Sequence, residues 1–226
     1  MGWVERIRLR GEYIIAKACR RTKEGFALQV TGDIDEPDLY KDLTLLEQWI
    51  TLVRKLSTET PILYITVHPR EDFERIVGSV KGVEIGVHGL RHLDHRTIST
   101  EKLRSELSEI AKYSSKFRFP FLARDLRTLS IASEFFDSDS SITSFRKPFP
   151  PFFLKPGFYE YPIIPPSDTF FRGRDIHPKQ AASVVAESME RCRNSSMFCT
   201  LLLHPNPYVM EILRYLIIDH EGPVPD

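Results

Sequence analysis

The sequence has no excess of charge of either sign and no long apolar run. Lysine plus arginine and aspartate plus glutamate each total 31 in 226 residues, so the formal net charge at pH 7 is zero. Because nucleic acids and anionic membranes favour a basic protein surface, we expect neither as the main partner. No apolar stretch reaches the length needed to cross a bilayer, so we expect no membrane span.

Cysteine and the side-chain amides are also scarce. The three cysteines, Cys19, Cys192 and Cys199, have no metal-type C-x-x-C spacing, and their odd number is typical of a reducing compartment. The charged N-terminus has no apolar core of the kind found in signal peptides, so we expect a cytoplasmic protein. Two asparagines and three glutamines beside abundant arginine, glutamate and lysine favour a thermophilic source.

The chain does contain a repeated alternation of strand-like and helix-like segments. A helical N-terminal extension is expected over 1–25, followed by strands at 26–31, 62–67, 83–87, 117–121, 135–138, 158–163 and 197–203 and helices at 39–56, 71–80, 100–113, 125–134, 178–193 and 207–218. Long loops are expected at 140–156 and 165–174. These units imply an α/β fold with a parallel sheet, either open or closed into a barrel. The length and the 42% hydrophobic content suit one domain spanning 1–226.

Histidines follow the third of these strands at a suggestive spacing. The stretch 83–95 has the sequence V-E-I-G-V-H-G-L-R-H-L-D-H, in which His88 comes directly after the apolar run and His92 four residues later. Imidazoles at i and i+4 can lie on one face of a helical turn, within reach of one metal ion. His95 and His68 have weaker patterns, and we expect structural or supporting roles for them.

Two carboxylates follow the first strand. Asp33 and Asp35 are two residues apart in T-G-D-I-D-E, so in an extended segment they point the same way. Such a pair either shares a proton or is held apart by a cation. The alternative is a solvated turn or a helix cap, but Asp38 is better placed to cap the helix over 39–56. One of the two, together with the paired histidines, would form a two-histidine, one-carboxylate set that suits Zn²⁺, Co²⁺, Ni²⁺ or Fe²⁺.

Other polar residues also follow predicted strands. Arg118 lies in R-F-P-F, Asp137 and Asp139 lie in F-D-S-D-S-S, and His204 lies in L-L-L-H-P. A parallel sheet gathers its strand ends on one face, so these groups should converge. A histidine after an apolar run is often only a core residue; because Pro205 ends the strand here, an acid or base role is favoured for His204. Asp168 and Glu160 lie in the late loops, and the sequence alone assigns them no role.

Taken in order, these motifs resemble those of the polysaccharide deacetylase (NodB-homology, carbohydrate esterase family 4) proteins over about residues 26–210. The resemblance implies a distorted (β/α) barrel of about seven parallel strands. It also implies a metal-dependent hydrolase that removes an acyl group, typically N-acetyl, from an amino sugar. Zn²⁺ is the expected ion, with Co²⁺ or Ni²⁺ as alternatives.

The resemblance also assigns roles to individual residues. It implies that Asp35, His88 and His92 are the metal ligands. Asp33 would be the general base and Arg118 would orient it. His204 would be the general acid, and Asp139 would be the carboxylate that tunes it. A backbone N–H near Phe121 would help to stabilise the oxyanion.

The sequence departs from the family pattern mainly in residues that shape the sugar groove. Gly32 stands where a bulky residue is more usual, Gly89 replaces a serine or threonine, and the fourth motif has no tryptophan. The substrate is therefore less defined than the chemistry, and we expect a carbohydrate or small-molecule amide, such as a small or lipid-linked amino sugar. Two alternatives stay open. One is hydrolysis of another non-peptide C–N bond, as in allantoinases or formamidases, and the other is a catalytically inactive carbohydrate-binding relative.

Overall fold

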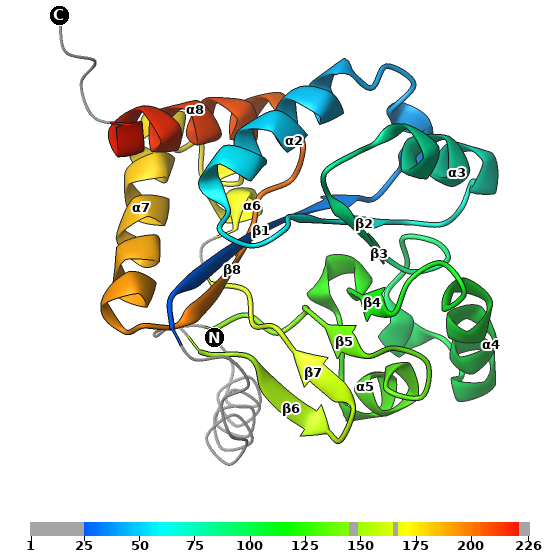
Figure 1. The fold of residues 1–226 in the computed structure, drawn as a ribbon. Coiled ribbons are helices and arrows are strands. Elements are labelled where there is room, and N and C mark those ends of the chain that lie inside the picture. The colour runs from blue at the N-terminus through cyan, green and yellow to red at the C-terminus, as the bar shows by residue number, and fades with distance from the viewer. Residues whose placement is uncertain (1–24, 145–148, 165–166, 222–226) are drawn as a thin grey trace, which may run out of the picture.

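The computed structural model of the chain describes residues 25–144, 149–164 and 167–221 (Figure 1). The predicted N-terminal helix over 1–25, Gly25 apart, lies outside these residues. The described part is an α/β structure in which helices cover a single curled sheet. No helix in it is both long and apolar enough to cross a membrane.

The sheet contains eight strands, in the order β6-β7-β5-β4-β3-β2-β1-β8. Their bounds are β1 Ala27–Ile34, β2 Ile62–Ile65, β3 Glu84–Val87, β4 Lys116–Phe117, β5 Ser138–Asp139, β6 Phe152–Lys155, β7 Phe158–Glu160 and β8 Phe198–Leu202. Every neighbouring pair is parallel except β6 with β7, which form an antiparallel hairpin at one edge. Seven strands are therefore mutually parallel, as predicted.

Ile163 draws the two ends of this sheet towards each other. It forms isolated parallel bridges with Thr143, which follows β5, and with Thr200 in β8. The amide of Ile164 also donates a hydrogen bond to the Thr200 carbonyl at 2.8 Å. Because β8 and β7 lie near opposite ends of the strand order, these contacts curl the sheet into a distorted barrel, and the predicted fold class is confirmed.

The helices pack on the outside of the curled sheet. They are α2 Thr44–Leu56, α3 Arg70–Ser79, α4 Thr100–Ile110, α5 Leu126–Ala132, α6 Asp168–Arg172, α7 Pro178–Asn194 and α8 Pro207–Glu221. Helix α8 packs against both α2 and α7, and α4 packs against α5 (Figure 1). Several starts follow ordinary capping chemistry: the Ser99 hydroxyl accepts from the Lys102 amide, and Asp125 and Thr128 form a capping box.

Apart from strand and helix ends displaced by a few residues, three predicted segments differ from the structure, and the first is the predicted loop over 140–156, which contains strand β6. The helix after β1 begins at Thr44 rather than at residue 39, because Pro37–Leu39 forms a separate 3₁₀ turn and Asp42, not Asp38, accepts from the Thr44 amide at 2.9 Å. The predicted loop over 165–174 contains helix α6. This short helix matters because it carries three residues of the candidate site, Asp168, Thr169 and Arg172.

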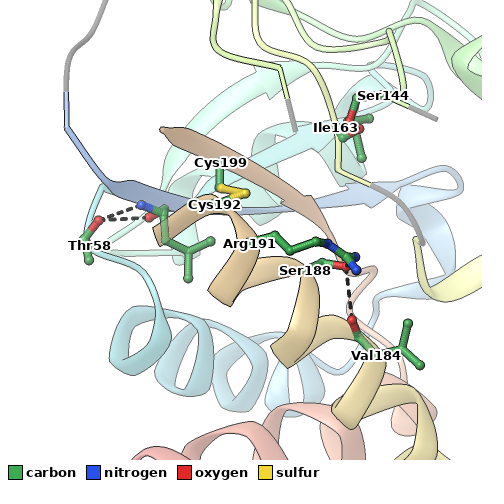
Figure 2. Close-up of a disulfide and its surroundings, with 9 residues drawn as sticks. Thr58, Ser144, Ile163, Val184, Ser188, Arg191, Cys192 and Cys199 are labelled. Carbon is green, nitrogen blue, oxygen red and sulfur yellow. Dashed lines mark hydrogen bonds between the residues drawn. A yellow bond between two sulfur atoms is a disulfide. The ribbon is translucent and has the colours of Figure 1, made fainter. Parts of the chain in front are cut away.

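Cys192 in α7 and Cys199 in β8 are joined by a disulfide bond in the buried interface between these elements (Figure 2). Disulfides are rare in reducing compartments. The odd cysteine count is therefore no longer an argument for such a compartment, and the cytoplasmic location stays a prediction.

Candidate active site

The candidate site lies where the parallel strands end. Asp33 is in the last part of β1 and Asp35 follows that strand directly; His88 follows β3, Arg118 follows β4, and His204 comes two residues after β8. The carboxyl ends of parallel strands meet at one edge of a sheet, so side chains far apart in sequence converge there. The structure brings all five of these residues together, as the sequence predicts.

Three of the converging side chains are arranged to hold a metal ion. Asp35 Oδ1 lies 3.3 Å from His88 Nε2 and 3.3 Å from His92 Nε2, and the three ligand atoms all lie within 4.8 Å of one another. Ligands at ordinary zinc distances in a tetrahedral shell are about 3.4 Å apart. Asp35 Oδ1 is also buried and accepts no hydrogen bond from any described residue, which leaves it available to a cation. The residues present therefore fit a divalent transition metal.

The protonation of these groups suits a cation as well. Burial alone would raise the pKa of the Asp35 carboxyl, but the neighbouring His88 imidazole, followed by His92 and His204, lowers it to about 2. Burial lowers the pKa of His92 below its ordinary value. A carboxylate that stays ionised beside an imidazole that stays neutral is the state in which both bind metal.

The orientation of the His88 ring is fixed by a contact on the Nδ1 side, away from Asp35. Its Nδ1 lies 3.0 Å from the carbonyl oxygen of Arg118, and only 1% of the residue is exposed. A proton on Nδ1 would donate to this carbonyl and leave Nε2 unprotonated, facing Asp35. Such a backbone partner fixes the tautomer of a metal-binding histidine.

Asp33 is held by a buried arginine. Arg118, with none of its surface exposed, donates from Nη1 to Asp33 Oδ1 at 2.7 Å. Its other donors bond to Thr31 Oγ1 at 3.0 Å and to the Oγ and carbonyl oxygen of Ser140 at 2.8 and 2.7 Å. These four hydrogen bonds fix the orientation of the guanidinium, and the second carboxylate oxygen of Asp33 faces the histidines, 3.8 Å from Nε2 of both His88 and His204.

A glycine and a tyrosine complete the support of Arg118. The Arg118 guanidinium carbon lies 4.2 Å from the centre of the Tyr64 ring, a cation–π contact. Tyr64 in β2 is aligned with Gly86 in β3, where a Cβ atom would come within 2.3 Å of that ring. Gly86 therefore provides the space for this ring, a function that sequence reasoning missed because it depends on strand register.

His204 is bound by a carboxylate, but not by the one predicted. Its Nδ1 lies 2.7 Å from Asp168 Oδ1, and its backbone amide donates to the same oxygen at 3.1 Å. Burial alone would lower the pKa of His204, but the hydrogen bond and charge of Asp168 outweigh it and raise the pKa to about 9. The prediction that Asp139 takes this position is wrong, because helix α6 brings Asp168 to the ring.

Asp139 instead belongs to a buried pair of carboxyl groups with Glu160. The two residues are aligned in β5 and β7, and neither has exposed surface. Asp139 Oδ1 accepts from Ser141 Oγ at 2.7 Å, while Glu160 Oε1 accepts from the amides of Ser141 and Ile142. Burial and the charge of Asp139 raise the pKa of Glu160 well above its ordinary value. Two buried carboxyl groups this close favour sharing one proton, and the pair lies behind the loop that holds Arg118.

The site opens into a pocket of about 690 Å³. It is lined by Asp33, Asp35, Glu36, Leu39, Tyr40, His92, Thr169, Arg172, Gly173, His204 and Asn206. Beside it the Phe121 ring stacks 4.1 Å from the His92 ring and remains 63% exposed. The cavity is large enough for a small substrate. A single molecule bound in it could contact Asp33, Asp35, His92 and His204 together.

The sequence matches no protein-family profile and no curated protein, but solved structures share its fold. A Mycobacterium smegmatis protein described as a polysaccharide deacetylase superposes with a TM-score of 0.65 at 19% identity, covering 87% of this chain and 84% of the other. The chain has the polysaccharide deacetylase fold. A carbohydrate esterase family 4 pseudoenzyme from Bacillus anthracis gives a TM-score of 0.52 at 15% identity, over 89% of this chain and 62% of the other. A family 4 carbohydrate esterase from Streptomyces lividans in complex with acetate gives 0.50 at 9% identity, over 88% and 87%.

Two departures from the deacetylase motifs have local explanations. A Cβ on Gly32 would come within 2.7 Å of the Trp49 indole, whose Nε1 donates to the Leu203 carbonyl at 2.9 Å. The indole of α2 therefore fills the space at this position and fixes the strand end before His204. Gly89 has a φ of +89°, which favours glycine over the serine or threonine expected there.

The two remaining histidines near the candidate site do not reach it. His95 is fully buried and packs against the rings of Phe117 and Phe119. Burial lowers its pKa to about 4, so it stays neutral at physiological pH. His68 follows β2 at the same edge of the sheet but is exposed.

Proposed function

We propose that the protein is a metal-dependent hydrolase that removes an N-acetyl or similar acyl group from an amino sugar or a related carbohydrate. One observation carries the proposal. The Asp35, His88 and His92 triad lies beside an arginine-held carboxylate, Asp33, and a carboxylate-held histidine, His204, and Asp33, Asp35, His92 and His204 line one pocket. A base, an acid and a metal site on one cavity are the parts that amide hydrolysis requires.

Asp33 is the base in this proposal. Arg118 holds its Oδ1, so Oδ2 is directed into the site to accept a proton from the attacking water. The bound ion, Zn²⁺ with Co²⁺ or Ni²⁺ as alternatives, would lower the pKa of that water and polarise the substrate carbonyl. Arg118 keeps the carboxylate in place during the transfer, because its other donors are already bonded to Thr31 and Ser140.

His204 is the acid. Asp168 raises its pKa to about 9, so the imidazole carries a proton at neutral pH. Its Nε2 lies 3.8 Å from Asp33 Oδ2 and His204 lines the pocket. A substrate amide in the pocket whose nitrogen faces His204 Nε2 would receive the proton on that nitrogen as the C–N bond breaks, and the amine would leave uncharged.

Metal content tests this proposal first. We expect about one equivalent of a transition metal in the purified protein, and its loss in an Asp35→Ala/His92→Ala variant, because two of the three ligands are gone. His68→Ala is the matched control, since it removes an exposed histidine from the same edge of the sheet and should retain the metal.

Acetate release then tests the reaction. The loaded wild type should release acetate from N-acetylated sugars, whereas turnover of ureides or formamides alone would assign the site to another C–N bond. If the protein takes up none of Zn²⁺, Co²⁺ or Ni²⁺ on reconstitution, the hydrolase proposal fails. A carbohydrate-binding role, like that open to an inactive relative, would then be the better explanation.

A further inference from the structure

One charged group in the pocket has no part in the reaction proposed above. Arg172 lines the same cavity as the metal triad, yet it contacts neither the triad nor Asp33. Among the described residues no carboxylate lies within ion-pair distance of its guanidinium, whereas Arg70, Arg96 and Arg104 each hold one. An arginine facing a binding pocket without an acidic partner is suited to bind an anion from outside the protein.

Helix α6 fixes the position of Arg172 relative to His204, the proposed acid. Asp168, at the start of this helix, is fully buried and bonded to His204, and Phe171 is anchored in the core. Arg172 follows Asp168 by four residues, which places it one helical turn away, a rise of about 6 Å. That separation is comparable to the width of one sugar ring, so an amide at the acid and a charged group at Arg172 can belong to one small molecule.

The charge balance of the pocket is compatible with an anionic ligand. Asp33 is neutralised by Arg118, and a divalent ion would more than offset Asp35. Glu36 is the remaining acidic group of the lining, and its negative charge balances the positive charge of Arg172. The charge of Arg172 also affects the pKa of Tyr40, which lines the pocket. Burial, followed by Asp35 and Asp168, raises the pKa of the Tyr40 phenol to about 12, and Arg172 acts in the opposite direction.

We propose that Arg172 binds an anionic group, a phosphate or a carboxylate, carried by the amino sugar whose acyl group is removed. This inference rests on the proposed function and names its substrate class. Arg172 is a specificity residue here: it contributes to binding of the charged substituent and takes no part in proton transfer. Neutral N-acetyl sugars would still reach the metal triad, but with lower affinity.

The test compares neutral and charged forms of one sugar. The substrates are N-acetylglucosamine, its phosphates at the anomeric or primary hydroxyl, and N-acetylmuramic acid, which carries a carboxylate. We expect the full-length, metal-loaded wild type to favour at least one charged compound. Arg172→Ala should raise the KM for that compound by about 10- to 100-fold, with kcat and the neutral sugar little changed. The compound with the lowest KM shows whether the site binds a phosphate or a carboxylate.

Two variants sharpen the comparison. Arg172→Lys should recover part of the affinity, because it keeps the charge but not the forked geometry. Arg174→Ala is the matched control: Arg174 lies two residues further on, 3.8 Å above the Phe170 ring and outside the pocket lining, and its loss should leave every KM unchanged.

Failure of the inference differs from failure of the proposed function. If Arg172→Ala weakens neutral and charged sugars equally, or if the wild type favours no charged compound, the inference is wrong although the hydrolase stands. If no compound releases acetate, calorimetric titration with the same compounds still shows whether Arg172 binds an anionic group. Tighter binding of a charged sugar that Arg172→Ala abolishes would support the anion site in a protein that is not a deacetylase.

Discussion

His204, the proposed acid, illustrates how a neighbouring carboxylate changes the protonation of a histidine. Its burial favours the neutral imidazole, but the short contact with Asp168, followed by the charges of Asp33 and Asp35, raises its pKa and keeps it protonated. The two residues are 36 positions apart in sequence, and Asp168 lies in a proline-rich stretch that predicts a loop. Sequence reasoning therefore singled out His204 but not Asp168, the carboxylate that contributes most to its protonation.

Replacing Asp168 should change the pH dependence of the reaction. In Asp168→Asn the amide can still accept a hydrogen bond but carries no charge, so the pKa of His204 falls from about 9. The proton is then lost at lower pH, and the alkaline limb of the kcat–pH profile moves down. Above neutral pH we expect kcat to fall by about 10- to 100-fold. Rates of acetate release measured across the pH range will show this shift.

Thr169→Val is the control for that measurement. It alters the next residue of α6, which also lines the pocket, without touching the His204 ring. Its alkaline limb should stay in place. An unmoved limb in Asp168→Asn would mean that another group sets the protonation of His204.

At the scale of elements, a glycine in β1 and a tryptophan in α2 fit together. The Trp49 indole lies over Gly32 and bonds to the carbonyl of Leu203, so it ties β1, α2 and the end of β8 into one unit. Trp49 has no exposed surface. The position of His204 therefore depends on a contact between two segments that do not carry it.

Gly32→Ala should be destabilising for this reason. Its Cβ would lie 2.7 Å from the indole and 3.2 Å from the Leu203 oxygen, so one of the elements must shift. Overpacking of this kind costs about 1–3 kcal/mol. Urea denaturation should show the loss, and Gly32→Ala should cost less in a Trp49→Phe background, where the clashing ring is gone.

A second glycine provides the control. Gly78 lies in α3, and a Cβ there would meet nothing within 4 Å. Gly78→Ala should be neutral or stabilising by up to about 1 kcal/mol, because alanine restricts the unfolded chain. Equal losses for the two alanine substitutions would show that the contact with Trp49 is not the cause.

The elements themselves were largely predictable. Apolar runs and helical periodicity located the parallel strands, with ends displaced by a few residues, and the strand ends located Asp33, Asp35, His88, Arg118 and His204. What could not be predicted depends on long-range geometry. The Tyr64–Gly86 contact needs the register of β2 and β3, and α6 is stabilised by the burial of Asp168 and Phe171 rather than by a local pattern.

The fold of the whole molecule places a buried acidic pair behind the candidate site. Asp139 and Glu160 come from different strands and are adjacent only because β5 pairs with β7. Since burial and the Asp139 charge raise the pKa of Glu160, the folded protein keeps a proton there that the unfolded chain releases above the ordinary glutamate pKa of 4.5. A group bound to more protons in the native state makes stability fall as pH rises.

Glu160→Gln should remove this part of the pH dependence. The amide cannot ionise, its oxygen can accept from the backbone of Ser141 and Ile142, and its nitrogen can donate to Asp139. Relative to wild type, we expect the variant's free energy of unfolding to be lowest near pH 4 and to increase towards pH 8. Urea denaturation at several pH values measures this difference. Glu187→Gln, on the exposed face of α7, should show no such trend. A difference between Glu160→Gln and wild type that stays constant with pH would mean that Glu160 is ionised in the folded protein, and that the pair does not share a proton.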